Sequence, residues 1–310
     1  MKKIFSTLFL LAGINSIINA QQVLPDEQFL INKFSLSPAY AGFSEMPEVY
    51  MGYRQEWRGI NGAPTKAMVN FNTPLASKMG IGGTINYQQY GIFSQFSLSL
   101  AYAYRIIIND NQMICLGLSA GINKFFIGFN YTKPQEQIDP VVASSDPIRN
   151  TTLDAAFGAA YKYRKFNTGI SVMQLPEGIV WHSGQSVYAA KRYVNIHATY
   201  LYDISRNWQL EPCLVTQLNG TNSLVFQFAT LVKFKEIIWL GGSIKKRNEI
   251  GMIFGLNYKN IILNYSYNFG GNGLVNYSSG SQEITLGYKF DKNKKQSVLK
   301  PDQPYNKWID

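Results

Sequence analysis

The sequence lacks several features on which common protein classes depend. Only two of its 310 residues are cysteines and two are histidines. After the first 20 residues no apolar run approaches the about 18 residues that a membrane-spanning helix needs. These absences argue against a disulfide framework, a zinc site and a helical membrane protein.

The two histidines do not fit a catalytic site. His182 lies in an expected loop, and His197 lies near the middle of an expected strand with no serine placed to partner it. A nucleophilic triad needs a nucleophile, a base and an orienting group that meet in space. There is also no Cys-x-x-Cys or His pair at i, i+4. We therefore expect no enzyme, no catalytic or metal-binding residue and no cofactor.

The cysteines, Cys115 and Cys213, fall on the polar face of expected strands that lie four strands apart. Two free thiols are the simpler interpretation, because a disulfide would require their Cα atoms to approach within about 7 Å.

The first 20 residues are typical of a secretory signal. Lys2 and Lys3 precede the apolar residues 4–18, and a small-residue cleavage site places the cut between Ala20 and Gln21. The formal net charge of +10 favours anionic partners, such as lipid phosphates or acidic proteins. Nucleic acid is not expected as a partner, because a secreted chain does not meet it.

What the sequence does contain is alternation. Aromatic residues make up 14% of the chain, and apolar side chains alternate with small or polar ones in segment after segment, as in residues 153–164. A period of two marks a strand with one apolar face and one wetter face. This pattern predicts 14 strands, at approximately 49–57, 66–74, 80–89, 94–105, 112–124, 151–163, 166–175, 192–203, 207–218, 223–234, 236–245, 248–258, 260–269 and 282–290.

The connections between these strands alternate between tight and long. The even-numbered strands are followed by short connections, whereas long ones occupy 58–65, 125–150, 176–191 and 270–281. With the N-terminus in the periplasm, every tight turn falls on the periplasmic side and the long loops face outward. The predicted fold is therefore all-β, a 14-stranded antiparallel transmembrane barrel of the outer membrane.

Individual residues agree with this prediction. Trp57, Tyr104, Trp208 and Tyr258 near strand ends suit the aromatic girdles of a barrel. Pro212 is out of place in mid-strand, which predicts a bulge there or a turn of the neighbouring polar residues toward the lumen.

The expected organisation has four parts. A signal peptide (1–20) precedes a periplasmic N-terminal segment (21–48), the barrel (49–290) and a basic periplasmic tail (291–310). Whether residues 21–48 fold against or into the barrel is left open by the sequence. The tail is either a solvated extension or a docking segment with Tyr305 and Trp308 as anchors. Basic residues at the periplasmic turns are candidates for contacts with partners or with lipid headgroups.

Two segments carry a family resemblance. The run Ser37-Pro38-Ala39-Tyr40-Ala41-Gly42 resembles the NPAYAG element of the PorP/SprF family of type IX secretion outer-membrane proteins, and residues 53–64 resemble its YRxQWxGIxGAP element. Residues 101–105, 207–212, 239–241 and 279–284 also fit the family. Ser37, Glu56 and Asn61 depart from the usual Asn, Gln and Asp.

The resemblance implies a non-enzymatic role in type IX secretion. Expected partners are outer-membrane lipid, the periplasmic and ring components of the machine, and a secreted client with a C-terminal sorting domain, such as a gliding adhesin. The motif residues are candidates for structural roles or partner contacts: Pro38, Ala39, Tyr40, Ala41, Gly42, Arg54, Trp57, Gly62, Ala63 and Pro64. For Arg54 and Trp57 we favour a role in setting the first hairpin, and for residues 62–64 a role in a turn.

Two other functions remain open from the sequence. One is a passive outer-membrane channel or transporter for small apolar solutes. The other is a soluble barrel or sandwich that binds a ligand, which suits the slightly negative mean hydropathy but not the signal peptide and the loop pattern.

Overall fold

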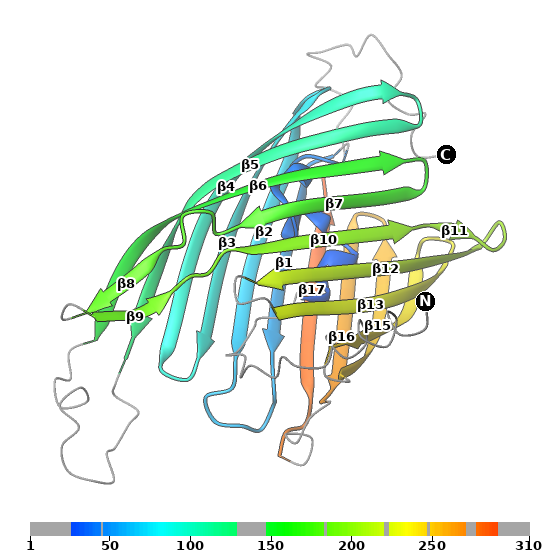
Figure 1. Cartoon of the computed structure of the whole chain (residues 1–310). Coiled ribbons are helices and arrows are strands. Elements are labelled where there is room, and N and C mark those ends of the chain that lie inside the picture. The colour runs from blue at the N-terminus through cyan, green and yellow to red at the C-terminus, as the bar shows by residue number, and fades with distance from the viewer. Residues whose placement is uncertain are drawn as a thin grey trace, which may run out of the picture.

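The computed structural model is a single β-barrel with a folded segment inside it (Figure 1). The structure describes residues 26–44, 46–128, 147–182, 185–219, 223–246, 249–270 and 277–290. The proposed cleavage site at Ala20 and Gln21 and the tail residues Tyr305 and Trp308 lie outside these residues.

The barrel wall consists of fourteen antiparallel strands, as the alternation predicts. They are β1 (Glu48–Gln55), β2 (Thr65–Ala76), β3 (Met79–Tyr90), β4 (Phe93–Asn109), β5 (Gln112–Ile127), β6 (Ile148–Tyr163), β7 (Phe166–Met173), β10 (Tyr193–Tyr200), β12 (Trp208–Asn219), β13 (Ser223–Phe234), β14 (Ile238–Lys245), β15 (Glu249–Tyr258), β16 (Ile261–Phe269) and β17 (Ser281–Lys289).

Each of these strands pairs with two neighbours, so the wall is a closed ring. Its first and last strands pair along their whole length, from Glu48 opposite Lys289 to Gln55 opposite Gln282. The pairing of β10 with β12 completes the circle. Closure satisfies the backbone groups that an open edge would leave unpaired in lipid, each at a cost of several kcal/mol.

The two faces of the wall differ as the alternation predicts. Large apolar side chains point outward, among them Leu100, Leu153 and Met252, which are 69%, 72% and 63% exposed. The inward positions carry buried polar residues such as Asn70, Asn264 and Thr285. An apolar exterior around a polar interior is the arrangement of a barrel bathed in lipid.

The two ends of the barrel are distinct. We call the end with the connections 77–78, 110–111, 164–165, 204–207, 235–237 and 259–260 the tight-turn end, and the opposite end the long-loop end. Phe290, which follows β17, donates its backbone N–H to Pro47 O at the tight-turn end. The C-terminal tail therefore begins there.

Two details of the wall differ from simple alternation. The long connection after β7 contains a hairpin that the sequence did not predict, formed by β8 (Ile179–His182) and β9 (Gln185–Ala189). At Pro212 the irregularity is real: the ladder between β10 and β12 ends at Thr199 opposite Cys213. It skips two residue pairs and resumes with Tyr202 opposite Leu210 in β11 (Tyr202–Asp203).

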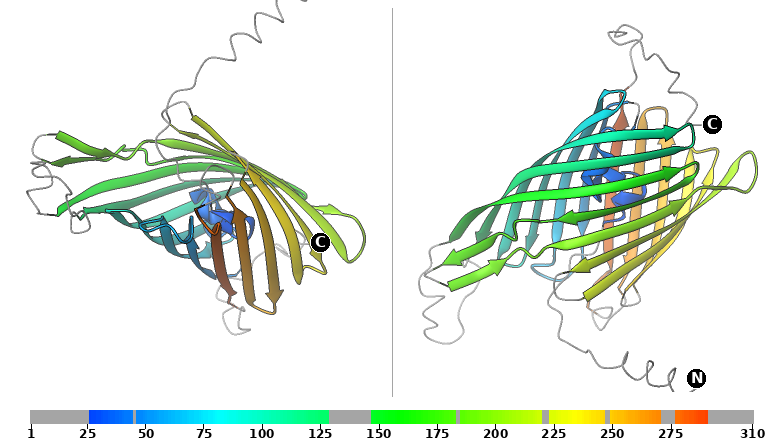
Figure 2. Two further views of the ribbon diagram at one scale, coloured as in Figure 1. Left: turned by 90° about the horizontal axis from the view of Figure 1, so that it is seen from below. Right: turned by 45° about the horizontal axis from the view of Figure 1, so that its top comes forward.

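Residues 26–44 lie inside the ring of strands (Figure 2). They form three short 3-10 helices, η1 (Glu27–Leu30), η2 (Lys33–Ser35) and η3 (Pro38–Tyr40). None of the helices in the described residues is long and apolar enough to cross a membrane. We call residues 26–44 the lumen segment.

Candidate functional site: the filled lumen

The lumen segment has local signals for its short helical turns. Asn32 and Ser37 precede η2 and η3, and their side-chain oxygens accept hydrogen bonds from the backbone N–H groups of Phe34 (3.2 Å) and Ala39 (3.3 Å). Pro38 begins η3, where a missing N–H costs nothing. Ser37 stands where the family element has Asn, and both residues are good N-caps, so the departure preserves this contact.

Glycines in the wall allow the lumen segment to lie against it. A Cβ atom at Gly117 or Gly158 would overlap the segment at Ser37, Pro38 and Ala39. Gly82 faces the ring of Phe34 in the same way. The small residues that the alternation places on the inner face thus form the surface against which the segment packs, and we call Gly117 and Gly158 the glycine floor.

Polar side chains of the wall bind the middle of the segment. Ser171 Oγ and Asn195 Nδ2 donate hydrogen bonds to the carbonyl oxygen of Leu36, at 2.7 and 3.4 Å. The hydroxyl of Tyr40 donates to Asn167 Oδ1 and lies 2.6 Å from His197 Nε2. His197 therefore has a buried partner inside the barrel, which accounts for it without catalysis.

The segment leaves the lumen at the tight-turn end through Gly42. This residue has a left-handed backbone (φ 60°), and a Cβ there would overlap the backbone of Thr73. Asn72 Oδ1 accepts a hydrogen bond from Gly42 N at 3.2 Å, and the buried guanidinium of Arg105 donates to Gly42 O.

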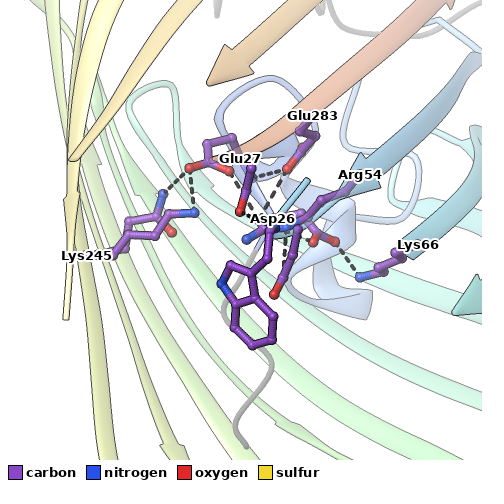
Figure 3. A network of polar contacts seen from close by, with 10 residues as sticks. Asp26, Glu27, Arg54, Lys66, Lys245 and Glu283 are labelled. Atoms are coloured by element: carbon purple, nitrogen blue, oxygen red, sulfur yellow. Dashed lines mark hydrogen bonds and ion pairs between the residues drawn. The ribbon is translucent and has the colours of Figure 1, made fainter. Parts of the chain in front are cut away.

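The other end of the segment is held by a cluster of buried charges (Figure 3). Arg54, which is 5% exposed, lies 3.3 Å from Glu27, 3.4 Å from Glu283 and 3.7 Å from Asp26. Its Nε donates to Glu56 at 3.0 Å.

Two lysines complete this cluster. Lys245 Nζ lies 2.6 Å from Glu27 Oε1, and both side chains are fully buried. Lys66 forms an ion pair with Asp26. Arg54, Lys66 and Glu283 lie within two residues of the long-loop ends of β1, β2 and β17, so the segment spans the lumen from one end to the other.

Electrostatics favours the charged form of Glu27. Burial alone would raise the pKa of this carboxyl, but Lys245 and Arg54 outweigh burial and lower the pKa below its usual value. Burial raises the pKa of Tyr40, which keeps its hydroxyl protonated and able to donate.

Apolar contacts fix the segment between these polar ends. Phe29, Leu30 and Leu36 pack against inward-facing residues of one half of the wall, including Leu231 and Trp239. On the opposite side, Phe34, Ala39, Tyr40 and Ala41 pack against Ala101, Ala103, Cys115 and Ala160. The interior of the barrel is therefore packed, with the lumen segment as its core.

The structure brings most of the predicted motif positions together around this segment. Pro38, Ala39, Tyr40, Ala41 and Gly42 lie in the lumen, and Arg54 points inward from β1 to meet the segment's first residues. Cys115 and Cys213 are free and buried, as predicted.

The remaining motif positions lie outside the lumen. Trp57 lies in the loop after β1 with a left-handed backbone (φ 44°), and its backbone N–H donates to Ser281 Oγ. Gly62, Ala63 and Pro64 belong to the same loop, where Pro64 O accepts from Glu56 N and Gly62 O from Gly91 N. Of the aromatic residues expected at strand ends, Tyr104, Trp208 and Tyr258 are exposed at the tight-turn end.

Several residues of the site were not among the predicted site positions, among them Glu27, Arg105, Lys245 and Glu283, although the alternation already places Glu283 on the inner face. The period-two alternation of side chains was the available signal for three of these residues. Arg105, Lys245 and Glu283 occupy inward positions of strands with apolar outward neighbours. Charged residues on the inner face near a buried segment need partners of opposite charge. The Asp26-Glu27 pair was the only acidic pair in the predicted N-terminal segment.

Comparison with known proteins identifies the family. The family model described as "Type IX secretion system membrane protein PorP/SprF" matches residues 18–288. The chain belongs to the PorP/SprF family. The resemblance seen in the two sequence elements is thereby confirmed over most of the chain.

Solved structures confirm the fold of this PorP/SprF protein. The toluene transporter TbuX of Ralstonia pickettii is 8% identical with a TM-score of 0.50, covering 86% of this chain and 94% of its own. The CymD monoaromatic hydrocarbon channel is 10% identical with a TM-score of 0.52, covering 88% and 95%. A FadL homologue of Pseudomonas aeruginosa matches at 11% identity and a TM-score of 0.48, covering 83% and 93%. A search of curated proteins gave no match. At these identities the structural likeness concerns the outer-membrane barrel fold alone.

Proposed function

We propose that this protein is a non-catalytic outer-membrane anchor or accessory component of type IX secretion. The barrel holds it in the membrane, and its tight-turn rim, tails or loops bind machine subunits or the sorting domain of a client, such as a gliding adhesin. The observation that carries this proposal is the family match over residues 18–288.

The proposal includes an orientation. The tight-turn end faces the periplasm, where the tail after Phe290 begins and where the exposed cations Arg164, Lys235 and Lys259 lie. In this orientation the tail can reach periplasmic partners, with Tyr305 and Trp308 as candidate contacts. The signal peptide is removed between Ala20 and Gln21, which mass measurement of the mature N-terminus tests.

Affinity purification from outer-membrane extracts tests the role in secretion. The full chain is expected to retain secretion subunits or a sorting-domain client, and removal of residues 291–310 to reduce that retention while the barrel still inserts. Tyr305→Ala with Trp308→Ala is expected to act like the deletion, and Gln303→Ala in the same tail is the matched control. Full-length protein that retains neither a secretion subunit nor a client would contradict the proposal.

A passive route for small apolar solutes is the second candidate. It is supported by the fold shared with TbuX and CymD, whose names describe a toluene transporter and a hydrocarbon channel. Against it stands the packed lumen, in which Phe34, Leu36 and Tyr40 are buried against the wall. Liposomes carrying the purified protein separate the two: an anchor leaves them closed, whereas a channel gives swelling or conductance.

A further inference from the structure

The lumen segment fills the barrel but forms no part of its hydrogen-bonded wall. Every wall strand has two strand partners, and the segment contributes no strand to the ring. Removing it would therefore break none of the ladder hydrogen bonds that close the wall. What holds it is a set of separate contacts from the inner face.

The contacts with residues 34–42 have the character of peptide recognition. The wall binds main-chain groups at Leu36 and Gly42, where Ser171, Asn195 and Arg105 donate to carbonyl oxygens. Because main-chain groups are common to all peptides, these bonds fix the position of a peptide backbone that is folded into short 3-10 turns.

Side-chain selectivity comes from two other features. Gly117 and Gly158 let the backbone of Pro38 and Ala39 lie directly against the wall, and Ala39 is itself 1% exposed in a cluster with Cys115, which leaves room only for a small side chain at that position. A polar pocket formed by Asn167 and His197 receives one aromatic hydroxyl, that of Tyr40. Together they describe a site for a short peptide in which small residues flank a tyrosine.

The contacts at the N-terminal end of the lumen segment are ion pairs rather than main-chain hydrogen bonds. Asp26 and Glu27 are held through their side chains, by Arg54, Lys66 and Lys245, next to the long-loop end. Ion pairs of this kind depend on both partners being charged, and removing one partner leaves the others buried and uncompensated. These ion pairs can thus be weakened without touching the residues that bind positions 34–42.

We propose that the lumen is a peptide-binding site whose resident ligand is this chain's own residues 34–42, held in place by the ion-pair cluster on Arg54. The ligand class is a short peptide that adopts 3-10 turns and has small residues on both sides of one tyrosine. The site does not depend on the secretion role, because it is built from the inner face alone.

A peptide-exchange experiment on the full chain tests this. The probe is a fluorescent synthetic peptide of residues 33–44, added to detergent-solubilised protein and followed by anisotropy. The Arg54→Gln barrel is expected to bind at least tenfold more probe than the wild type, because its own segment leaves the site more readily. Arg58→Gln, an exposed arginine in the adjacent loop, is the matched control and is expected to behave as wild type.

The peptide carries its own control. A probe with Ala39→Leu is expected not to bind, because Ala39 is fully buried among wall residues and a larger side chain would overlap them. Equal binding of both probes, or a folded Arg54→Gln barrel that takes up no probe, would overturn the proposal.

A second variant keeps the test open if Arg54→Gln does not fold. A specific protease site at position 45 leaves the wall natural and allows the segment to be cut from the barrel after folding. The cut segment is expected to stay bound through gel filtration and to be displaced by excess matching peptide, but not by the Ala39→Leu peptide. Loss of the barrel fold on cutting, or a segment that excess peptide cannot displace, would show that the segment is framework and not ligand.

Discussion

Single residues decide the electrostatics of the lumen, and Lys245 is the clearest case. Its ammonium group lies 2.6 Å from Glu27 and both are shielded from solvent. Lys245→Met keeps much of the side-chain volume but leaves Glu27 short of a cation, at an expected cost of about 3–5 kcal/mol. The measurement is the temperature at which the folded barrel converts to the unfolded band on a detergent gel. Lys259→Met, at an exposed turn, is the control and is expected to change stability by less than about 0.5 kcal/mol.

The charge on Glu27 also predicts a pH dependence. A carboxyl whose pKa is lowered by folding contributes stability that is present above its ordinary pKa of 4.5 and is lost as the pH falls through the folded value. We therefore expect the wild type to lose stability below about pH 4.5 relative to Glu27→Gln, whose profile is flatter. Melting curves between pH 7 and pH 3 provide the comparison, and parallel profiles for the two proteins would refute this role of Glu27.

The hydroxyl of Tyr40 gives a third prediction at this scale. Tyr40→Phe leaves Asn167 and His197 buried without their shared partner, and such orphaned polar groups cost about 1–3 kcal/mol. Thermal unfolding should show this loss, and Tyr277→Phe, at a residue that is 76% exposed, should show none. A Tyr40→Phe barrel as stable as wild type would mean that the pocket adapts to the missing hydroxyl.

Among the elements, β12 tests how the wall accommodates a proline. Pro212 lies where the ladder to β10 is interrupted, so its missing N–H removes no bond on that side. Pro212→Ala is expected to change stability by less than about 1 kcal/mol, whereas Val215→Pro, placed inside both ladders, should cost about 3 kcal/mol or more. The yield of folded, heat-modifiable barrel distinguishes these outcomes. A severe defect in Pro212→Ala would show that the pyrrolidine ring of the proline is needed at this position.

The elements also show what sequence could and could not predict. Strands such as β13 and β16 were predictable because one face meets lipid and the other the lumen, which imposes a period of two on the residues. The path of residues 26–44 was not predictable, because short 3-10 turns bury side chains without any regular period.

Tertiary partners account for the rest of the difference. Arg54 was singled out from its motif, but only its partner Glu56 is near it in sequence. The other three carboxylates, of Asp26, Glu27 and Glu283, come from two distant parts of the chain that the folded barrel brings together. The β8–β9 hairpin was missed because its strands are short, and two-stranded hairpins depend on packing for stability.

For the whole molecule, the proposed orientation can be tested through the native cysteines. Cys115 and Cys213 are buried, so a membrane-impermeant maleimide should not label the wild type. We expect Arg58→Cys, at the long-loop end, to be labelled on intact cells, and Lys235→Cys, at the tight-turn end, only after the outer membrane is made permeable. The reverse pattern would invert the orientation and place the tail on the cell surface.

The lumen segment precedes the first wall strand in the chain and runs between opposite openings of the ring, from Asp26 near the long loops to Gly42 near the tight turns. If β1 and β17 pair first, the segment has to enter the closed ring lengthwise; if it docks first, the wall can close around it. The order of biogenesis thus matters: docking of this stretch before β1 and β17 pair is the direct route to the filled barrel, whereas entry into the closed ring is the slower route on which peptide exchange depends. Faults in residues 26–44 should accordingly appear as failed insertion of newly made protein, even where the finished barrel would have tolerated them.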